Sequence, residues 1–200
     1  MTFLLLAALV SAPSAKDLAD KLHGSVVEIR SAAPLSFGSA APLSFGTGVL
    51  LGGTLALTTL HSVAHASEGK LLASDDIEVF VPDVGPVKAL LRTALVDLDL
   101  AVLELAEPAG LALTLAPDEP AEGEPLLLMG AGEAVVIALG VRVAHRAGDG
   151  LLLEAGRFVD SRFWGGPLFD AQGRLAGILV TSIGQPHALA ISALRDLLQR

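Results

Sequence analysis

Short apolar runs separated by glycine- or proline-containing turns make up most of this chain, and they restrict the folds open to it. The composition agrees with many strands and turns, since the 200 residues are 52% hydrophobic and include 21 Gly and 11 Pro. Many short strands at close spacing predict an all-β fold, either a barrel or a sandwich. The expected strands lie in SVVEI (25–29), GTGVLL (46–51), TLALTT (54–59), DIEVFV (76–81), VKALLRTAL (87–95), LAVLELA (100–106), PLLLMG (125–130), AVVIALGVRVAH (134–145), GLLLEAG (150–156), GPLFD (166–170), RLAGILV (174–180) and HALAI (187–191).

A segment rich in proline, glutamate and alanine divides the chain into two halves. It runs from Pro108 to Pro125, and we place the connection between the halves at residues 111–122. Residues 16–110 then form the first half and residues 123–200 the second.

Two short helices are expected near the ends of the chain. Ala15–His23 places Leu18 and Leu22 on one helical face, and Gly24 ends that helix. The second helix spans Ala193–Arg200, with Ser192 as its N-cap.

The first 15 residues predict a secretory signal peptide. MTFLLLAALVSAPSA is an apolar run followed by small residues, and it is too short to span a bilayer as a helix. Cleavage is expected near Ala12 or Ala15, which would give an exported protein without a stable membrane anchor. The alternative is a buried N-terminal helix or strand, because the segment before the apolar run has no Lys or Arg.

Charge and cysteine content exclude several classes of protein. The net charge is -9 and no cluster of Lys or Arg occurs, which argues against a nucleic acid or an anionic membrane as partner. With no Cys, the chain has neither a disulfide framework nor a thiol nucleophile.

An octapeptide, SAAPLSFG, occurs twice in succession, at 31–38 and 39–46. Each copy contains a proline and a glycine, so we expect a surface loop between two strands. A longer surface loop costs little stability.

Three segments carry residues that suit acyl-transfer chemistry. His61 follows the apolar run LALTTL, and Asp99 precedes the run LAVL, with Asp97 as the alternative if the register is shifted. The third segment, SRFWGGPLFDAQGRLAGI, begins at Ser161 and has a turn signal at Gln172-Gly173. Peptide-bond hydrolysis of this kind needs a nucleophile, a His that moves the proton, an Asp that orients the His, and N–H donors for the oxyanion.

The order and spacing of these segments resemble the trypsin-like serine peptidases, in particular the HtrA/Deg-type protease domain without a PDZ domain. The resemblance implies two six-stranded antiparallel β-barrels with the site in the cleft between them, followed by a short C-terminal helix. It implies that His61 and Asp99 occupy two triad positions and that Trp164 occupies the position of the nucleophilic serine. The backbone N–H groups of Arg162 and Trp164 would form the oxyanion hole. Phe163, Ile178 and Val180 would line the cleft.

The nucleophile loop, residues 160–167, departs from the family pattern at its centre. Trp164 has an N–H donor and no nucleophilic oxygen, and Arg162 replaces a glycine. A non-glycine residue loses about 1–2 kcal/mol in left-handed geometry, so we expect the loop to relax with its N–H groups turned away. The sequence therefore predicts an inactive peptidase homologue whose cleft binds a protein or peptide segment, or is filled by Trp164 itself.

Other readings of these residues remain open. An active endopeptidase would need another nucleophile such as Ser161, or Thr181 and Ser182 on the following segment. His61 and His65 have a spacing that binds zinc on a helix, but the usual Glu after the first His is absent. Gly130-Ala131-Gly132 lacks a third glycine, which favours a strand-end turn over a nucleotide loop. No metal and no cofactor are expected.

Overall fold

The structure is a computed structural model of the whole chain, and it describes residues 14–32, 43–67, 70–110, 113–133, 135–156, 158–180 and 185–198. The predicted signal peptide lies outside these ranges except for Ser14 and Ala15. The first octapeptide copy begins in one described strand and the second copy ends in the next, while residues 33–42 between them lie outside.

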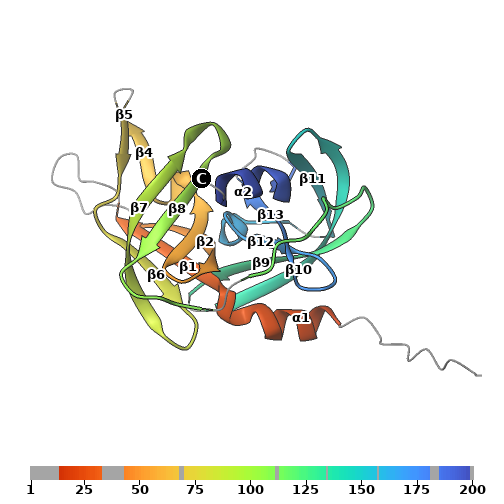
Figure 1. Cartoon of the computed structure of the whole chain (residues 1–200), viewed down its shortest axis with the longest axis horizontal. Helices are drawn as coiled ribbons and strands as arrows, with labels where there is room; N and C mark the ends of the chain where they lie inside the picture. The colour runs from red at the N-terminus through yellow and green to blue at the C-terminus, as the bar shows by residue number, and fades with distance from the viewer. Residues whose placement is uncertain are drawn as a thin grey trace, which may run out of the picture.

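The first half of the chain forms a closed antiparallel barrel in the order β1-β2-β3-β8-β7-β6 (Figure 1). Its strands are β1 (Val26–Ala32), β2 (Leu43–Gly52), β3 (Leu55–Thr59), β6 (Ile77–Val81), β7 (Gly85–Leu95) and β8 (Leu100–Leu105). The turn between β2 and β3 holds Gly52 and Gly53 at φ 100° and 61°, a conformation that glycine adopts without penalty.

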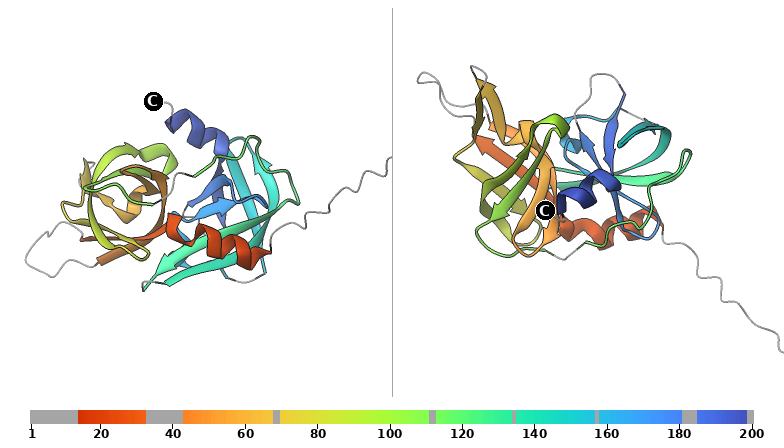
Figure 2. Two further views of the ribbon diagram at one scale, coloured as in Figure 1. Left: turned by 60° about the horizontal axis from the view of Figure 1, so that its bottom comes forward. Right: turned by 45° about the horizontal axis from the view of Figure 1, so that its top comes forward.

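The second half forms another closed antiparallel barrel, in the order β10-β11-β14-β13-β12-β9. Its strands are β9 (Pro125–Gly132), β10 (Val135–Ala147), β11 (Gly150–Ala155), β12 (Pro167–Phe169), β13 (Leu175–Val180) and β14 (His187–Ala190). The prediction of two six-stranded barrels with a short C-terminal helix is confirmed, and the two barrels lie side by side (Figure 2).

Three apolar cores hold this arrangement together. One fills the first barrel, including Ile29 and Leu103, and one fills the second, including Leu128 and Leu153. The third contains buried side chains from both barrels and both helices, and therefore lies where they meet. Successive side chains of a strand point to opposite faces, so one strand can contribute residues both to the interior of its barrel and to the core between the barrels.

The N-terminal helix α1 (Ala15–Leu22) packs against the second barrel, although its sequence position assigned it to the first half. Ser14 caps it in a capping box with Asp17. Leu18 and Leu22 are buried. A Cβ on Gly173, in the turn between β12 and β13, would be in van der Waals contact with both side chains.

The C-terminal helix α2 (Ile191–Leu198) begins earlier than predicted. Ser192 lies inside its first turn, so the prediction of Ser192 as N-cap was wrong. Its hydroxyl is 3.4 Å from Asp149 Oδ1 instead. Neither helix of the described residues has the length and hydrophobicity to cross a membrane.

A two-stranded sheet of β4 (Ala64–Ser67) and β5 (Lys70–Ala73) extends from the first barrel and was not predicted. Its strands are short and contain no Val, Ile or Thr, so the strand signal is weak. Four 3₁₀ helices complete the described structure, at η1 (His23–Ser25), η2 (Leu60–Ser62), η3 (Val96–Leu98) and η4 (Ser161–Phe163).

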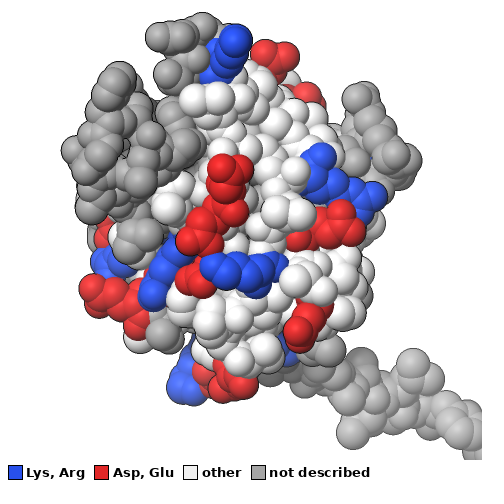
Figure 3. Space-filling view, turned by 90° about the vertical axis from the view of Figure 1, so that its left-hand side faces the viewer, with Lys and Arg blue, Asp and Glu red and all other residues white. Residues whose placement is uncertain are grey.

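Charged side chains of both signs lie next to one another on the outer face of the first barrel (Figure 3). Lys88, for example, lies 2.5 Å from Asp76 and 3.0 Å from Glu78. Among the described residues of this face, no basic patch of the kind that binds nucleic acid occurs.

Thr47 on β2 joins the first barrel to the loop before β12. Its N–H donates to the carbonyl of Trp164 at 2.8 Å, and its hydroxyl donates to the carbonyl of Arg162 at 2.5 Å. The same hydroxyl accepts from the N–H of Ala131 on β9 at 2.7 Å. Gly165 permits this approach, because a Cβ there would lie 2.2 Å from the carbonyl oxygen of Thr47.

We expect Gly165→Ala to lower the free energy of unfolding by more than about 2 kcal/mol. Gly165 has φ 79°, so alanine is disfavoured by about 1–2 kcal/mol before the clash with Thr47 is counted. Gly140→Ala is the matched control, since a Cβ there meets nothing within 4 Å, and we expect a change within about 1 kcal/mol. Urea denaturation measures both. Equal losses in the two variants would contradict the proposed close contact.

Candidate active site

His61 and Asp99 meet at the edge of the first barrel. His61 lies in η2 after β3, and Asp99 follows η3 before β8. His61 Nδ1 is 2.7 Å from Asp99 Oδ2, and the backbone N–H of His61 donates to Asp99 Oδ1 at 3.0 Å. The Leu60 N–H also donates to the carbonyl of Asp99, at 2.9 Å. Asp99 adopts a left-handed conformation with φ 52°, which aspartate tolerates better than most residues.

This pair has the geometry of an oriented imidazole. A carboxylate on Nδ1 fixes the ring and favours the tautomer whose Nε2 can accept a proton. Each side chain is 35% exposed, so the pair lies at the surface of the cleft.

The structure supports neither Asp97 as the partner of His61 nor a helical zinc site made by His61 and His65. Asp97 lies in η3 and is exposed, so it does not share a strand face with Asp99 as its spacing suggested. His65 lies on strand β4 and His61 in a 3₁₀ helix, so the two do not share the face of an α-helix. The described residues contain no group of three His, Cys, Asp or Glu that could hold a metal ion.

Trp164, which the family resemblance assigned to the nucleophile position, contacts the imidazole of His61. Its ring centroid is 5.4 Å from that of His61, and the ring planes meet at 75°, an edge-to-face contact. Thr59 Oγ1 lies 3.5 Å from His61 Nε2, but Thr59 is completely buried and cannot reach a substrate. Trp164 therefore covers the His61 side of the cleft.

The two backbone N–H groups assigned to the oxyanion hole make hydrogen bonds within their own loop. Asp160 caps η4 and accepts from the N–H of Arg162 at 3.0 Å. The N–H of Trp164 donates to the carbonyl of Ser161 at 3.1 Å. An oxyanion hole needs both donors directed at one point in the cleft. The loop is instead a closed 3₁₀ turn, and Arg162 is outside the left-handed region.

Asp160 also holds the side chain of Arg162. Arg162 Nη2 lies 2.6 Å from Asp160 Oδ2, and Arg162 Nε lies 3.1 Å from Oδ1. This hydrogen bonding raises the pKa of the Arg162 guanidinium, and the nearby charge of Glu133 raises it further. The loop is thus fixed through both the backbone and the side chain of Arg162.

The expected cleft-lining residues are buried. Phe163 is 2% exposed and belongs to the core of the second barrel, so the expectation that it lines the cleft was wrong. Ile178 and Val180 on β13 lie in the core between the barrels. Phe163 is the last residue of η4, and its ring packs where Gly130 has no side chain, since a Cβ there would lie 2.8 Å from the ring.

Ser161 is exposed at the first position of η4 and makes no hydrogen bond to His61 among the described contacts. Thr181 and Ser182, the other candidate nucleophiles, lie outside the described residues. Gly130-Ala131-Gly132 forms the end of β9, as a strand-end segment would.

A groove of about 580 Å³ opens beside the loop, on the side of Arg162. Arg30 forms part of its wall, with its guanidinium 3.9 Å from the centroid of the Phe80 ring and 2.6 Å from Glu28. Phe45 lines the same groove and is 52% exposed. Because the groove combines strands of both barrels with η4, it lies between them.

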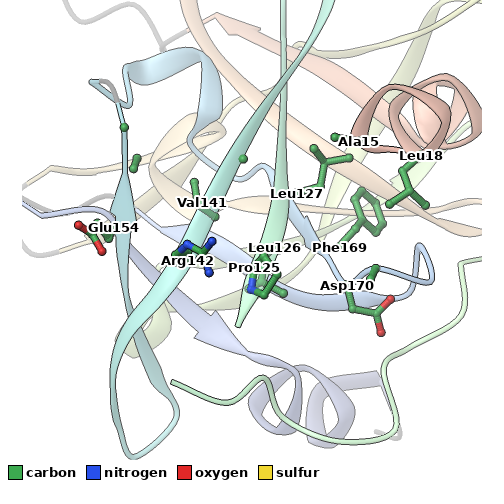
Figure 4. Close-up of a pocket in the computed structure, with 14 residues that line it drawn as sticks. Ala15, Leu18, Pro125, Leu126, Leu127, Val141, Arg142, Glu154, Phe169 and Asp170 are labelled. Carbon is green, nitrogen blue, oxygen red and sulfur yellow. The ribbon is translucent and has the colours of Figure 1, made fainter. Parts of the chain in front are cut away.

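A second pocket, of about 600 Å³, lies under α1 on the second barrel (Figure 4). Leu18 and Phe169 line one side, and Val141, Arg142 and Glu154 lie on the other. It shares no lining residue with the groove beside Arg162 and contains none of the predicted site residues. The cleft with His61 remains the candidate site.

Two residues of the site, Thr47 and Asp160, were missed by sequence reasoning. Asp160 stands two residues before Arg162, and an acidic residue in that position is a signal for a helix cap. Nothing in the sequence distinguishes Thr47 from any other threonine on a strand.

Comparison with known proteins agrees with this architecture. In structure, the chain is similar to the active form of the Rv3671c protease from M. tuberculosis, with TM-score 0.77 and 22% identity over 96% of this chain and 86% of that chain. Two inactive forms of that protease, one a serine-to-alanine mutant, give TM-score 0.72 and 21% identity, over 96% of this chain and 93% or 94% of theirs. No curated protein sequence matches. The family model for a trypsin-like peptidase domain matches residues 46–178, which include His61, Asp99 and Trp164. The chain therefore belongs to the trypsin-like peptidase family.

Proposed function

We propose that the protein is an exported, catalytically inactive member of this family that binds a protein or peptide segment at the former substrate cleft. One observation carries the inactivity: the loop that should supply a nucleophile and two oxyanion donors supplies neither. Trp164 stands at the nucleophile position, and the N–H groups of Arg162 and Trp164 donate within the loop.

The two losses are each large on the scale of enzyme catalysis. Removing the serine of a triad lowers turnover by about 10⁶-fold in a well-studied protease. Removing one oxyanion donor lowers it by about 10²- to 10³-fold. In an inactive protein, His61 and Asp99 would have a structural role, because their two hydrogen bonds join η2 to the residue before β8.

Binding is supported by the groove that the loop leaves open. Trp164 fills the space next to His61, while Phe45 and the groove beside Arg162 remain accessible. An exposed aromatic side chain in a groove between two barrels is a typical anchor for a partner chain.

A fluorophosphonate probe tests the inactivity. We expect no labelling of the natural protein and none of Trp164→Ser, because Asp160 still holds the N–H of Arg162. We expect Arg162→Gly with Trp164→Ser to be labelled at residue 164, since the double change restores both the hydroxyl and the freedom of the loop. Phe163 stays unchanged, because it is a core residue. Intact mass and peptide mapping measure the labelling.

Each arm of the labelling experiment can contradict the proposal. Labelling of the natural protein, at Ser161 or at any other residue, would show an active hydrolase and identify its nucleophile. Strong labelling of Trp164→Ser alone would show that the oxyanion donors are available in the natural loop. Adding His61→Ala to the Arg162→Gly, Trp164→Ser variant is the control, because labelling that depends on the imidazole should then be lost.

Export is proposed with cleavage after Ala12, because that position preserves the N-cap of α1. Ser14 Oγ accepts from the N–H of Asp17 at 3.2 Å, and Asp17 Oδ2 accepts from the N–H of Ser14 at 3.1 Å. Cleavage after Ala15 would remove this capping box, which is worth about 1 kcal/mol.

We therefore expect the protein secreted by a bacterial host to begin at Pro13, as read by intact mass. Ser14→Ala should lower its free energy of unfolding by about 1 kcal/mol. A mature protein beginning at Lys16 would contradict the choice of site, and full-length protein retained in the cell would contradict export.

A further inference from the structure

We propose that the groove beside Arg162 selects partner segments that carry a basic side chain, with Phe45 and Glu133 as the residues that select them. The inference rests on the proposed binding function and adds the chemistry of the partner to it. The argument for a basic partner is that both arginines of the groove already have carboxylate partners, whereas Glu133 forms no ion pair among the described residues.

Both arginines of the groove are already paired with a carboxylate. Arg30 lies 2.6 Å from Glu28, which is 3% exposed, and Arg162 lies 2.6 Å from Asp160. Each guanidinium is largely neutralised by its own carboxylate, so it adds little net positive charge to the groove.

Glu133 is the acid of this groove for which no ion pair forms within the described part of the chain. It is exposed, at the tip of the turn between β9 and β10, with φ 54°. The aliphatic part of Arg162 lies over Gly132, within about 3.4 Å of where a Cβ would be, so Glu133 sits next to the Arg162 arm of the groove. Glu28 and Glu133 balance the two arginines within the groove lining, and Asp160, which binds Arg162 from beside the groove, adds a third carboxylate.

Phe45 supplies the apolar contact that a basic side chain needs for its stem. Its ring is 52% exposed, and one face is directed to Arg30, whose guanidinium lies 5.8 Å from the ring centroid. Lys and Arg place their methylene stems on apolar surface and keep the charged end at the rim. A partner arginine or lysine can rest on Phe45 and direct its charge to Glu133.

The overall charge favours the same partner. A protein with net charge -9 attracts basic segments over a distance and repels acidic ones. The carboxylates around the groove and the net charge of the chain therefore favour the same kind of partner. The variants Glu133→Gln and Glu107→Gln, described below, separate these two effects.

The test uses three fluorescein-labelled blocked peptides, GGALRALG, GGALQALG and GGALEALG, titrated by fluorescence anisotropy at low salt. Trp164 is the single Trp and the chain has no Tyr, so its intrinsic emission reports whether unlabelled copies of these peptides bind at this site. We expect the arginine peptide to bind most tightly and to change the Trp164 emission. Its advantage should disappear at about 1 M salt, where the Debye length is about 3 Å.

The variant Glu133→Gln should weaken binding of the arginine peptide about two- to fivefold and bring it close to the glutamine peptide, as expected for an exposed ion pair. Phe45→Ala should weaken binding of all three peptides. Glu107→Gln is the matched control, because it removes the same charge at an exposed residue that does not line the groove. It should leave the preference unchanged.

Several outcomes would overturn the inference. Equal binding of the three peptides would leave a peptide-binding cleft without charge selection. A preference that survives in Glu133→Gln, or that is lost equally in Glu107→Gln, would mean that the net charge or another site is responsible. No binding at millimolar peptide would reject the groove as a site for such segments, while the fluorophosphonate result would still decide the question of inactivity on its own.

Discussion

The hydrogen bonds of Thr47 are the interaction on which the site depends, because they join the two barrels at the loop itself. One threonine binds the carbonyls of Trp164 and Arg162 and the N–H of Ala131. Thr47 is completely buried, so removing its hydroxyl within the intact fold would leave the Arg162 carbonyl and the Ala131 N–H without this partner and shielded from water. The groove beside Arg162 adjoins this contact, since its lining includes Gly46, the residue before Thr47, and Ala131, which Thr47 binds.

Close contacts between backbones explain why the loop has glycine at positions 165 and 166. A Cβ at Gly165 would collide with Thr47, and one at Gly166 would lie 2.2 Å from the carbonyl of Met129. Both positions are constrained by the docking of backbone on backbone, whatever the chemistry. The side chains at 162 and 164 meet no such limit, since Arg162 is exposed and Trp164 packs against the second-barrel core and the His61 ring. The two glycines of GGPL are therefore explained by the barrel interface.

Much of the fold could be predicted from the sequence, because strands and turns have local signals. The Gly52-Gly53 hairpin and the runs that became β6 to β14 follow from apolar patterning and from glycines at positive φ. The contact of His61 with Asp99 could be anticipated only through the family resemblance, since 38 residues separate them. The burial of Phe163 and the packing of α1 on the second barrel could not be predicted, because both depend on where the barrels place distant surfaces.

The loop around Arg162 satisfies its polar groups through one acidic residue. Arg162 is excluded from the left-handed geometry that glycine allows, and the 3₁₀ turn gives its N–H an acceptor in Asp160. The same carboxylate then binds the guanidinium, so one acidic residue satisfies both the backbone and the side chain of Arg162. An oxyanion hole, by contrast, holds N–H groups without a protein acceptor and depends on substrate or water to satisfy them. The hydrogen bonds of the loop are thus satisfied within the protein, and the Trp164 ring lies edge-to-face on the imidazole of His61.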